Sequence, residues 1–339
     1  MTEDEQLIAN FVPLLGQMLA LGEEQKGSHL TEREVIAIRD KAPCIMVPSE
    51  VAKELEEKRG FRDVNPENCW ADWNQLRVEF TGSGYLPKIV MCLPATQASV
   101  PNLQGILAEE ETDFEISDYD AAMVDAFEKA DLGRCPSLTK LELGSIAEHS
   151  SIVYILSDNF PARFAVNRAY HFLRVGSRLL EAGAIAMKCE SSGIAHSRQR
   201  WLELAGQAER GADGEWILFW SALFDAFVQF PIVLEDDFYS CGMHLLGKPD
   251  VIVSRELMQQ TMKTESATDS IVYLFEVFCL YLLAECEDGT FASGYTFQPD
   301  LEWPSFRVVW EECTGYDQDD LFYNPYGRWR FTSVDAALG

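Results

Sequence analysis

The chain is poor in basic residues. Of its 339 residues only 27 are lysine or arginine, against 55 aspartate or glutamate, so the net charge is −28. A surface this negative repels the phosphates of nucleic acids and the head groups of anionic membranes, so we expect neither as a partner. The same charge favours fast encounter with a basic protein, although many acidic proteins use it only to stay dispersed.

Export signals and long apolar segments are also missing. Met1 to Glu5 is acidic and lacks the basic start and apolar core of a signal peptide. The longest apolar run, from Ile271 to Ala284, contains Glu276 and falls short of the roughly 20 residues of a membrane span. The nine cysteines are odd in number and form no C-x-x-C pair, which is typical of reduced thiols. These features predict a cytoplasmic protein.

Motifs of the common enzyme classes are absent. The sequence has no G-x-S-x-G elbow, Walker loop, G-x-G-x-x-G after a strand, or H-E-x-x-H. Only five histidines occur, which leaves few general bases. The sequence therefore names no reaction, and no cofactor is predicted.

Hydrophobic periodicity predicts an α+β fold in two parts. Residues 1–85 read as a small helical region, with helices over Asp4 to Leu21, from Thr31, from Pro48 and around Trp70. The pattern changes near the glycines at 82 and 84, and residues 86–339 mix helices and strands without regular βαβ repetition. This predicts a mostly antiparallel sheet with helices packed on one face.

Charge is unevenly distributed along this second part. Residues 162–211 carry eight basic and four acidic side chains, whereas residues 212–339 carry six and 22. The two segments could neutralise each other inside the domain, which is the commoner arrangement, or the basic one could line a pocket.

The best candidate for an anion site lies in the basic segment. Ser191, Ser192 and Gly193 precede a predicted helix through His196, Arg198 and Arg200. A helix start offers free backbone donors, and here hydroxyls and cations accompany them. The alternative, which is more common, is an ordinary capped helix with exposed arginines.

Thiol and imidazole groups offer a second, weaker set of candidates. Cys241 or Cys189 with His196 could form a nucleophile and base, and His244 could complete an active site with the Ser191 to Arg200 segment. The same cysteines and histidines are zinc-ligand types. However, Cys241 and His244 would point to opposite faces of a strand, so no metal site is predicted.

Two tryptophans are candidates for an interaction surface. Trp70 and Trp73 are three residues apart and so share one face of a predicted helix. Docking of this face onto the rest of the protein is the favoured interpretation, and ligand stacking or oligomerisation through it is the alternative.

Three stretches resemble a family of uncharacterised bacterial proteins. Gly242 to Asp250 (GMHLLGKPD) and Glu287 to Thr290 (EDGT) are similar to a family of domains of unknown function that covers the chain from about Pro87 onward. Ala37 to Trp70 resembles an N-terminal extension found in some members. The resemblance implies an α+β fold in a bacterial cytosol, and it implies no activity.

Two functions remain open from the sequence. The first is a non-catalytic acidic protein, toxin-neutralising or secretion-associated, that binds a basic protein partner. The second is an enzyme or small-anion binder that uses the Ser191 to Arg200 segment with His244. The sequence favours the first.

Overall fold

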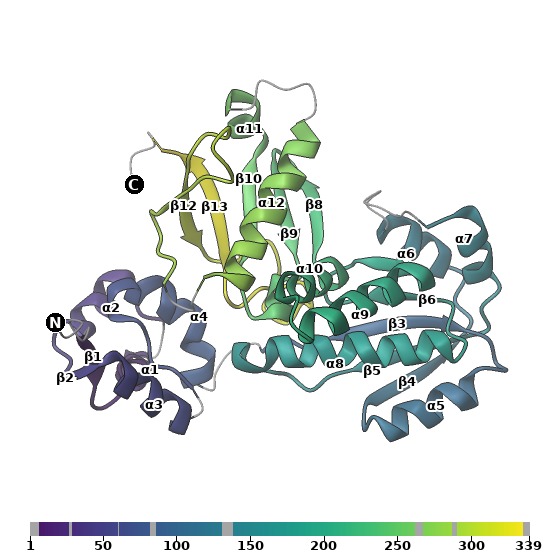
Figure 1. Cartoon of the computed structure of the whole chain (residues 1–339), viewed down its shortest axis with the longest axis horizontal. Coiled ribbons are helices and arrows are strands. Elements are labelled where there is room, and N and C mark those ends of the chain that lie inside the picture. Colours follow the sequence, from purple (N-terminus) through teal and green to yellow (C-terminus); the bar gives the residue numbers. More distant parts are fainter. Residues whose placement is uncertain are drawn as a thin grey trace.

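In the computed structural model the chain is described over residues 7–26, 29–59, 61–81, 86–130, 138–261, 267–286 and 290–334. The boundary glycines 82 and 84, Cys135 and residues 287–289 of the EDGT stretch lie outside these ranges. The described chain forms three lobes: an N-terminal part, a five-stranded sheet and a six-stranded sheet (Figure 1).

The N-terminal part consists of helices around a small two-stranded sheet. Its elements are β1 (Leu7–Phe11), α1 (Leu15–Lys26), α2 (Glu32–Arg39), β2 (Cys44–Pro48), α3 (Ser49–Arg59), the short 3-10 helix η1 (Pro66–Asn68) and α4 (Cys69–Thr81). The helix predicted over Asp4 to Leu21 is wrong over Leu7–Phe11, and residues 4–6 lie outside the described ranges. Leu7–Phe11 instead pairs antiparallel with β2, a distant segment that supplies its backbone partners, and Pro13 separates it from α1.

This part has its own apolar cluster, built only from residues between 9 and 80, with Leu15, Val35 and Trp73 fully buried in it. A buried ion pair braces α4: the Arg62 guanidinium donates two hydrogen bonds, of 2.6 and 2.7 Å, to the Asp72 carboxylate. The helix predicted from Thr31 is confirmed, and the Glu34 carboxylate accepts a hydrogen bond from the Thr31 backbone N–H.

The five-stranded sheet is entirely antiparallel, in the order β4-β5-β3-β6-β7. Helices cover both of its faces, α5 and α8 on one and α6 and α7 on the other, which explains why every residue of β3 is buried. The elements are β3 (Val90–Ala95), α5 (Val100–Glu109), β4 (Asp113–Asp118), α6 (Met123–Ala130), α7 (Lys140–Ala147), β5 (Ser151–Leu156), α8 (Ala162–Glu181), β6 (Ala186–Cys189), β7 (Ala195–Ser197) and α9 (Arg198–Ala212).

The six-stranded sheet has the order β11-β12-β13-β10-β9-β8, with one parallel pair, β10 and β13. Helix α12 packs on one face, and side chains of the loop after β12 pack against the other. The elements are α10 (Trp216–Phe227), β8 (Gln229–Leu234), β9 (Asp237–Cys241), η2 (Met243–Leu246), β10 (Asp250–Ser254), α11 (Arg255–Thr261), α12 (Ala267–Ala284), β11 (Thr296–Phe297), β12 (Phe306–Glu311) and β13 (Arg328–Ser333). The predicted α+β class is confirmed.

One apolar cluster joins the two large sheets through α10. The aromatic-rich sequence from Trp216 to Phe230, which stops before Pro231, predicts one helix. The helix ends earlier, at Phe227, because Gln229–Leu234 pairs with β9. Pro231 is accommodated there because β8 is an edge strand, where a missing N–H need not break a ladder. Within the described ranges, no helix is long and apolar enough to cross a membrane.

Candidate functional site

The predicted anion site is not assembled around a helix start. Residues 195–197 pair with β6 as strand β7, so the helix expected after Gly193 begins only at Arg198, where the Ser197 hydroxyl accepts the N–H of Arg200. Ser191 and Ser192 are buried. The Ser191 hydroxyl accepts the N–H of Val90 at 2.9 Å and donates to the carbonyl of Lys88 at 2.8 Å.

The two arginines of this segment are engaged by neighbours. Arg198 Nε donates to the Leu180 carbonyl at 3.1 Å, and Arg200 Nη2 lies 2.7 Å from Asp225 Oδ2 on α10. On α8, Arg178 forms ion pairs with Glu109 and Glu110. Part of the positive charge of residues 162–211, at Arg178 and Arg200, is therefore balanced by nearby carboxylates.

The histidine and thiol candidates lie in the interior. His196 Nε2 is 3.1 Å from the Ala226 carbonyl, and His244 Nε2 is 3.1 Å from that of Leu321. Burial raises the pKa of Cys241 well above its ordinary value, whereas a thiolate nucleophile needs a lowered pKa. No group of three or more His, Cys, Asp or Glu side chains that could hold a metal ion occurs in the described part of the chain.

The two tryptophans of α4 differ in their environment. Trp73 is fully buried in the N-terminal apolar cluster, so it is not exposed to a partner. Trp70 is half-buried and lies edge-to-face against Trp310 of β12, with ring centroids 6.1 Å apart. Both side chains dock within the molecule, and Trp70 also borders a cleft.

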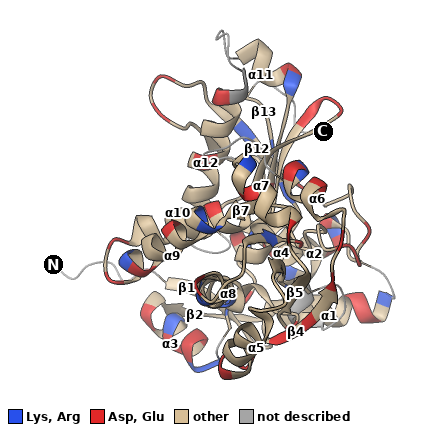
Figure 2. Ribbon diagram, turned by 90° about the vertical axis from the view of Figure 1, so that its right-hand side faces the viewer, with Lys and Arg blue, Asp and Glu red and all other residues tan. Residues whose placement is uncertain are grey.

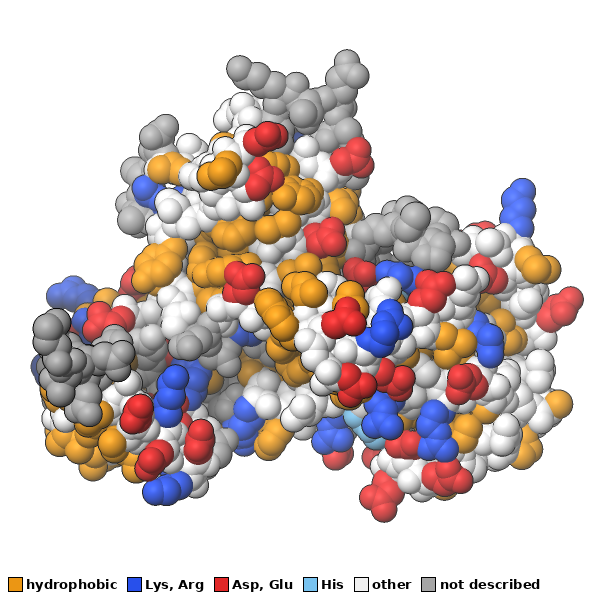
Figure 3. Space-filling model, in the orientation of Figure 1, with side chains coloured by type: hydrophobic (Ala, Val, Ile, Leu, Met, Phe, Trp, Pro, Cys, Tyr) orange, Lys and Arg blue, Asp and Glu red, His pale blue; other side chains and the backbone are white. Residues whose placement is uncertain are grey.

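Sequence reasoning missed an exposed apolar surface on α10 and α12. At the start of α10, Trp216 is 51% exposed and Ile217 45%. On α12, Tyr273 is 40% exposed, and the half-buried Val277 and Leu280 follow it on the same side of the helix. The two helices pack together, and hydrophobic side chains cover α12 and continue to α10 (Figure 3). We call these five residues the α10–α12 surface.

Helix α12 is less buried than its sequence predicts. The sequence from Ser270 to Glu285 predicts a long buried helix, but the structure buries only one side of it. Tyr273 and Glu276 on the other side are exposed.

The surroundings of this surface are acidic. Acidic residues are spread over all three lobes, and basic residues are fewer (Figure 2). No lysine or arginine occurs at all in residues 211–247 or 264–306, the segments that contain α10 and α12. The exposed acids among the described residues of these segments are Asp213, Glu215, Glu235, Asp236, Asp269, Glu276, Glu285, Asp300 and Glu302. The segments that form the surface therefore combine apolar side chains with negative charge.

The loop after β11 supports the α12 end of the surface. The Tyr273 ring packs against Trp303, with centroids 5.3 Å apart. Its hydroxyl donates to Asp300 Oδ2 at 2.9 Å, and this bond raises the pKa of Tyr273. Tyr273 is thus held in place while 40% of it stays exposed.

Comparison of the chain with protein-family models, with curated proteins and with solved structures found no match. The resemblance to a bacterial family of domains of unknown function stays a prediction.

Proposed function

We propose that this protein is a non-catalytic binding protein that captures a basic amphipathic segment of a protein partner on the α10–α12 surface. The observation that carries the proposal is the exposed apolar face of α10 and α12 on segments that contain acids and no lysine or arginine. Large aromatic side chains such as Trp216 and Tyr273 are the residue types that anchor protein interfaces.

The two properties of the surface have separate roles. Apolar contact supplies affinity, about 25 cal/mol per Å² of apolar area removed from water, less the costs of association. Exposed carboxylates such as Glu215 and Glu276 attract a basic segment over distance and disfavour an acidic one. A helix with an apolar face and flanking lysines or arginines matches both properties.

The placement of the other candidates supports a binding role over catalysis. Cys241 is buried with a raised thiol pKa, and the Arg200 guanidinium is paired with Asp225. His196 and His244 each have a ring nitrogen at hydrogen-bond distance from a backbone carbonyl. Each of these groups is therefore held by a structural partner or by burial in the interior.

The proposal is tested with two synthetic helical peptides that share a leucine face, one flanked by lysines and the other by glutamates. Fluorescence anisotropy measures the affinity of the full chain for each peptide. We expect saturable binding of the lysine peptide alone, and weaker binding as salt rises, since ionic strength screens the attraction. Equal binding of both peptides, or binding independent of salt, would contradict the proposal.

Variants locate the site. Trp216→Ala and Tyr273→Ala are each expected to weaken binding of the lysine peptide at least about fivefold, which is ~1 kcal/mol. Glu276→Lys should weaken binding of the lysine peptide and reduce the preference for it over the glutamate peptide. Leu141→Ala on α7 and Glu128→Lys on α6 change exposed residues of the other lobe, so they are matched controls that should leave binding unchanged.

A further inference from the structure

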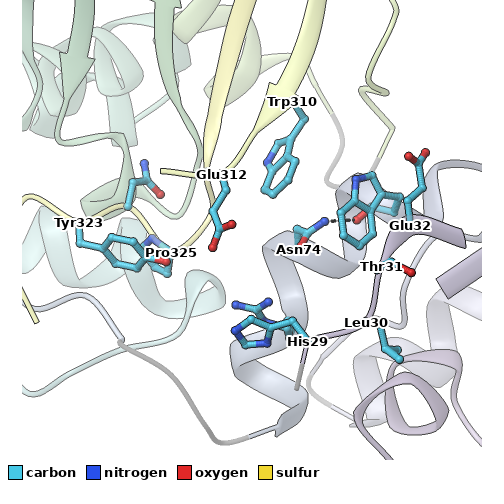
Figure 4. Close-up of a pocket in the computed structure, with 13 residues that line it drawn as sticks. His29, Leu30, Thr31, Glu32, Asn74, Trp310, Glu312, Tyr323 and Pro325 are labelled. Carbon is cyan, nitrogen blue, oxygen red and sulfur yellow. Dashed lines mark hydrogen bonds between the residues drawn. The ribbon is translucent and has the colours of Figure 1, made fainter. Parts of the chain in front are cut away.

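A cleft of about 380 Å³ lies between the N-terminal part and the six-stranded sheet (Figure 4). Small-molecule sites range from roughly 300 to 1,000 Å³, so its size suits a small ligand. Its walls come from the residues that precede α2, from α4, from the end of β12 and from the loop before β13. It is separate from the α10–α12 surface and shares no residue with it.

The wall on the sheet side is built around Trp310 and is held rigidly. Trp310 Nε1 donates to the Tyr326 carbonyl at 2.9 Å, and its ring meets the edge of Trp70. Gly327 has φ +81°, and a Cβ there would lie 2.6 Å from the Trp310 indole. Only glycine therefore lets the backbone approach this ring so closely.

The loop that carries Tyr323 is anchored by the buried side chain of Asn324. Its Nδ2 donates to the Lys248 carbonyl at 3.1 Å and to Asp250 Oδ2 at 2.7 Å, and its Oδ1 accepts the N–H of Tyr326. Trp70, Trp310 and Tyr323 thus give the cleft three fixed aromatic rings.

Besides Glu32 at the start of α2, the carboxylate that lines the cleft is that of Glu312. In Figure 4 its side chain and that of His29 point toward the same space, which Trp310 overhangs. Glu312 forms no hydrogen bond or ion pair with any residue that the structure describes. Its charge acts on the ring next to it: after burial itself, it is the largest cause that raises the pKa of Tyr323.

We propose that this cleft binds a small organic ammonium ion, whose charged head lies beside Glu312 and whose apolar body contacts Trp70, Trp310 and Tyr323. Aromatic rings attract a cation through their negative faces, and sites for quaternary ammonium groups combine several such rings. The net charge of −28 raises the local concentration of any cation. A rigid, preformed wall lowers the entropy lost on binding.

The effect of Arg77 on binding differs between a cationic and a zwitterionic ligand. Arg77 also lines the cleft, and its charge acts on Tyr323 in the opposite direction to that of Glu312. A ligand that is only cationic is repelled by Arg77, whereas a zwitterion, such as a free amino acid, is attracted through its carboxylate. Removal of this charge therefore has opposite effects on the two ligand classes.

The test is titration calorimetry of the full chain with choline and with its uncharged isostere 3,3-dimethyl-1-butanol. We expect saturable binding of choline and binding of the isostere at least about tenfold weaker, because only choline carries the charge. Equal affinity for both, or no binding of choline, overturns the proposal. Neither outcome bears on peptide binding at the α10–α12 surface.

Three variants of exposed or half-buried residues complete the test. Glu312→Gln is expected to weaken choline binding about tenfold with an unchanged thermal midpoint, whereas Glu276→Gln on α12 should leave it unchanged. Arg77→Gln is expected to strengthen it. An unchanged affinity in Glu312→Gln, or a weaker one in an Arg77→Gln protein whose thermal midpoint matches the wild type, overturns the assignment.

Discussion

Trp70 of α4 lies edge-to-face against Trp310 of β12, with ring centroids 6.1 Å apart and an interplanar angle of 81°. Nearby, Asn68 Nδ2 donates to the Phe291 carbonyl at 2.6 Å. These contacts join the N-terminal part to the lobe of the six-stranded sheet, and the Trp70–Trp310 pair also lines the cleft between them. Trp70 therefore connects two lobes of the fold.

Replacement of Trp70 by alanine is therefore expected to destabilise the protein by about 1–3 kcal/mol, from lost apolar burial and the lost aromatic pair. Urea denaturation measures this change in the free energy of unfolding. Trp216→Ala on α10 removes the same side chain from an exposed position and should change stability by less than about 0.5 kcal/mol. A similar effect of both variants would show that the Trp70 contact contributes little.

The ion pair between Arg62 and Asp72 should contribute far more to the stability of the fold than a surface ion pair does. Asp72 is fully buried and also accepts the N–H of Asn65 at 2.6 Å. Loss of one partner from a buried pair costs about 3–5 kcal/mol, so Asp72→Asn should lower the urea midpoint strongly. Asp40→Asn, which removes the exposed partner of Arg39, should cost about 0–1 kcal/mol.

Two glycines of α9 should respond oppositely to alanine. A Cβ at Gly211 would lie 2.2 Å from the backbone nitrogen of Phe219, where α9 and α10 meet. Gly211→Ala is therefore expected to destabilise the protein by about 1–3 kcal/mol. At Gly206 only the end of Arg210 comes within 4 Å, so alanine should stabilise the helix by about 0.5–1 kcal/mol. Thermal unfolding of the two variants measures the contrast.

Acid should weaken the start of α2. Hydrogen bonds from Lys26, and then from Thr31, lower the pKa of Glu34 from its ordinary 4.5 to about 2. Because the folded pKa is depressed, the stabilisation is present above pH 4.5 and is lost as pH falls from 4.5 toward 2. Carbon-13 NMR of the Glu34 carboxyl measures its pKa directly.

Lys26→Gln is the matched variant for this titration. It removes the largest cause of the shift, so the pKa of Glu34 should rise toward its ordinary value while the bonds from Thr31 remain. The difference in thermal midpoint between wild type and Lys26→Gln should shrink as pH falls below 4.5. A pKa of Glu34 that is unchanged in the variant would contradict this account.

Features governed by neighbours in sequence were predictable. The sequence from Ser151 to Leu156 predicts a strand, and β5 has these bounds. The periodic sequence from Arg163 to Ala182 predicts a helix, and α8 begins and ends within one residue of those positions. The helix that follows Thr31 also begins as predicted. In each case the alternation of apolar residues or a local capping pattern fixes the element, because its backbone partners or its buried face are set by residues close along the chain.

The candidate site was much less predictable. Nothing local distinguishes Trp70 from Trp73, yet one borders a cleft and the other is fully buried. The serines at 191 and 192 look like the start of a helix, but strand pairing of β7 with β6 takes over the residues that follow them. The exposure of α12 depends on which distant segments cover it.

The amino-acid sequence alone determined the net charge, the α+β class and the strongly periodic elements, because each follows from composition or from contacts a few residues apart. It also fixed the absence of lysine and arginine from the segments around α10 and α12. Only the tertiary structure decided which apolar side chains remain exposed there, and which aromatic rings meet around Glu312. Those properties depend on the packing of segments far apart in the chain, and no local pattern encodes such packing.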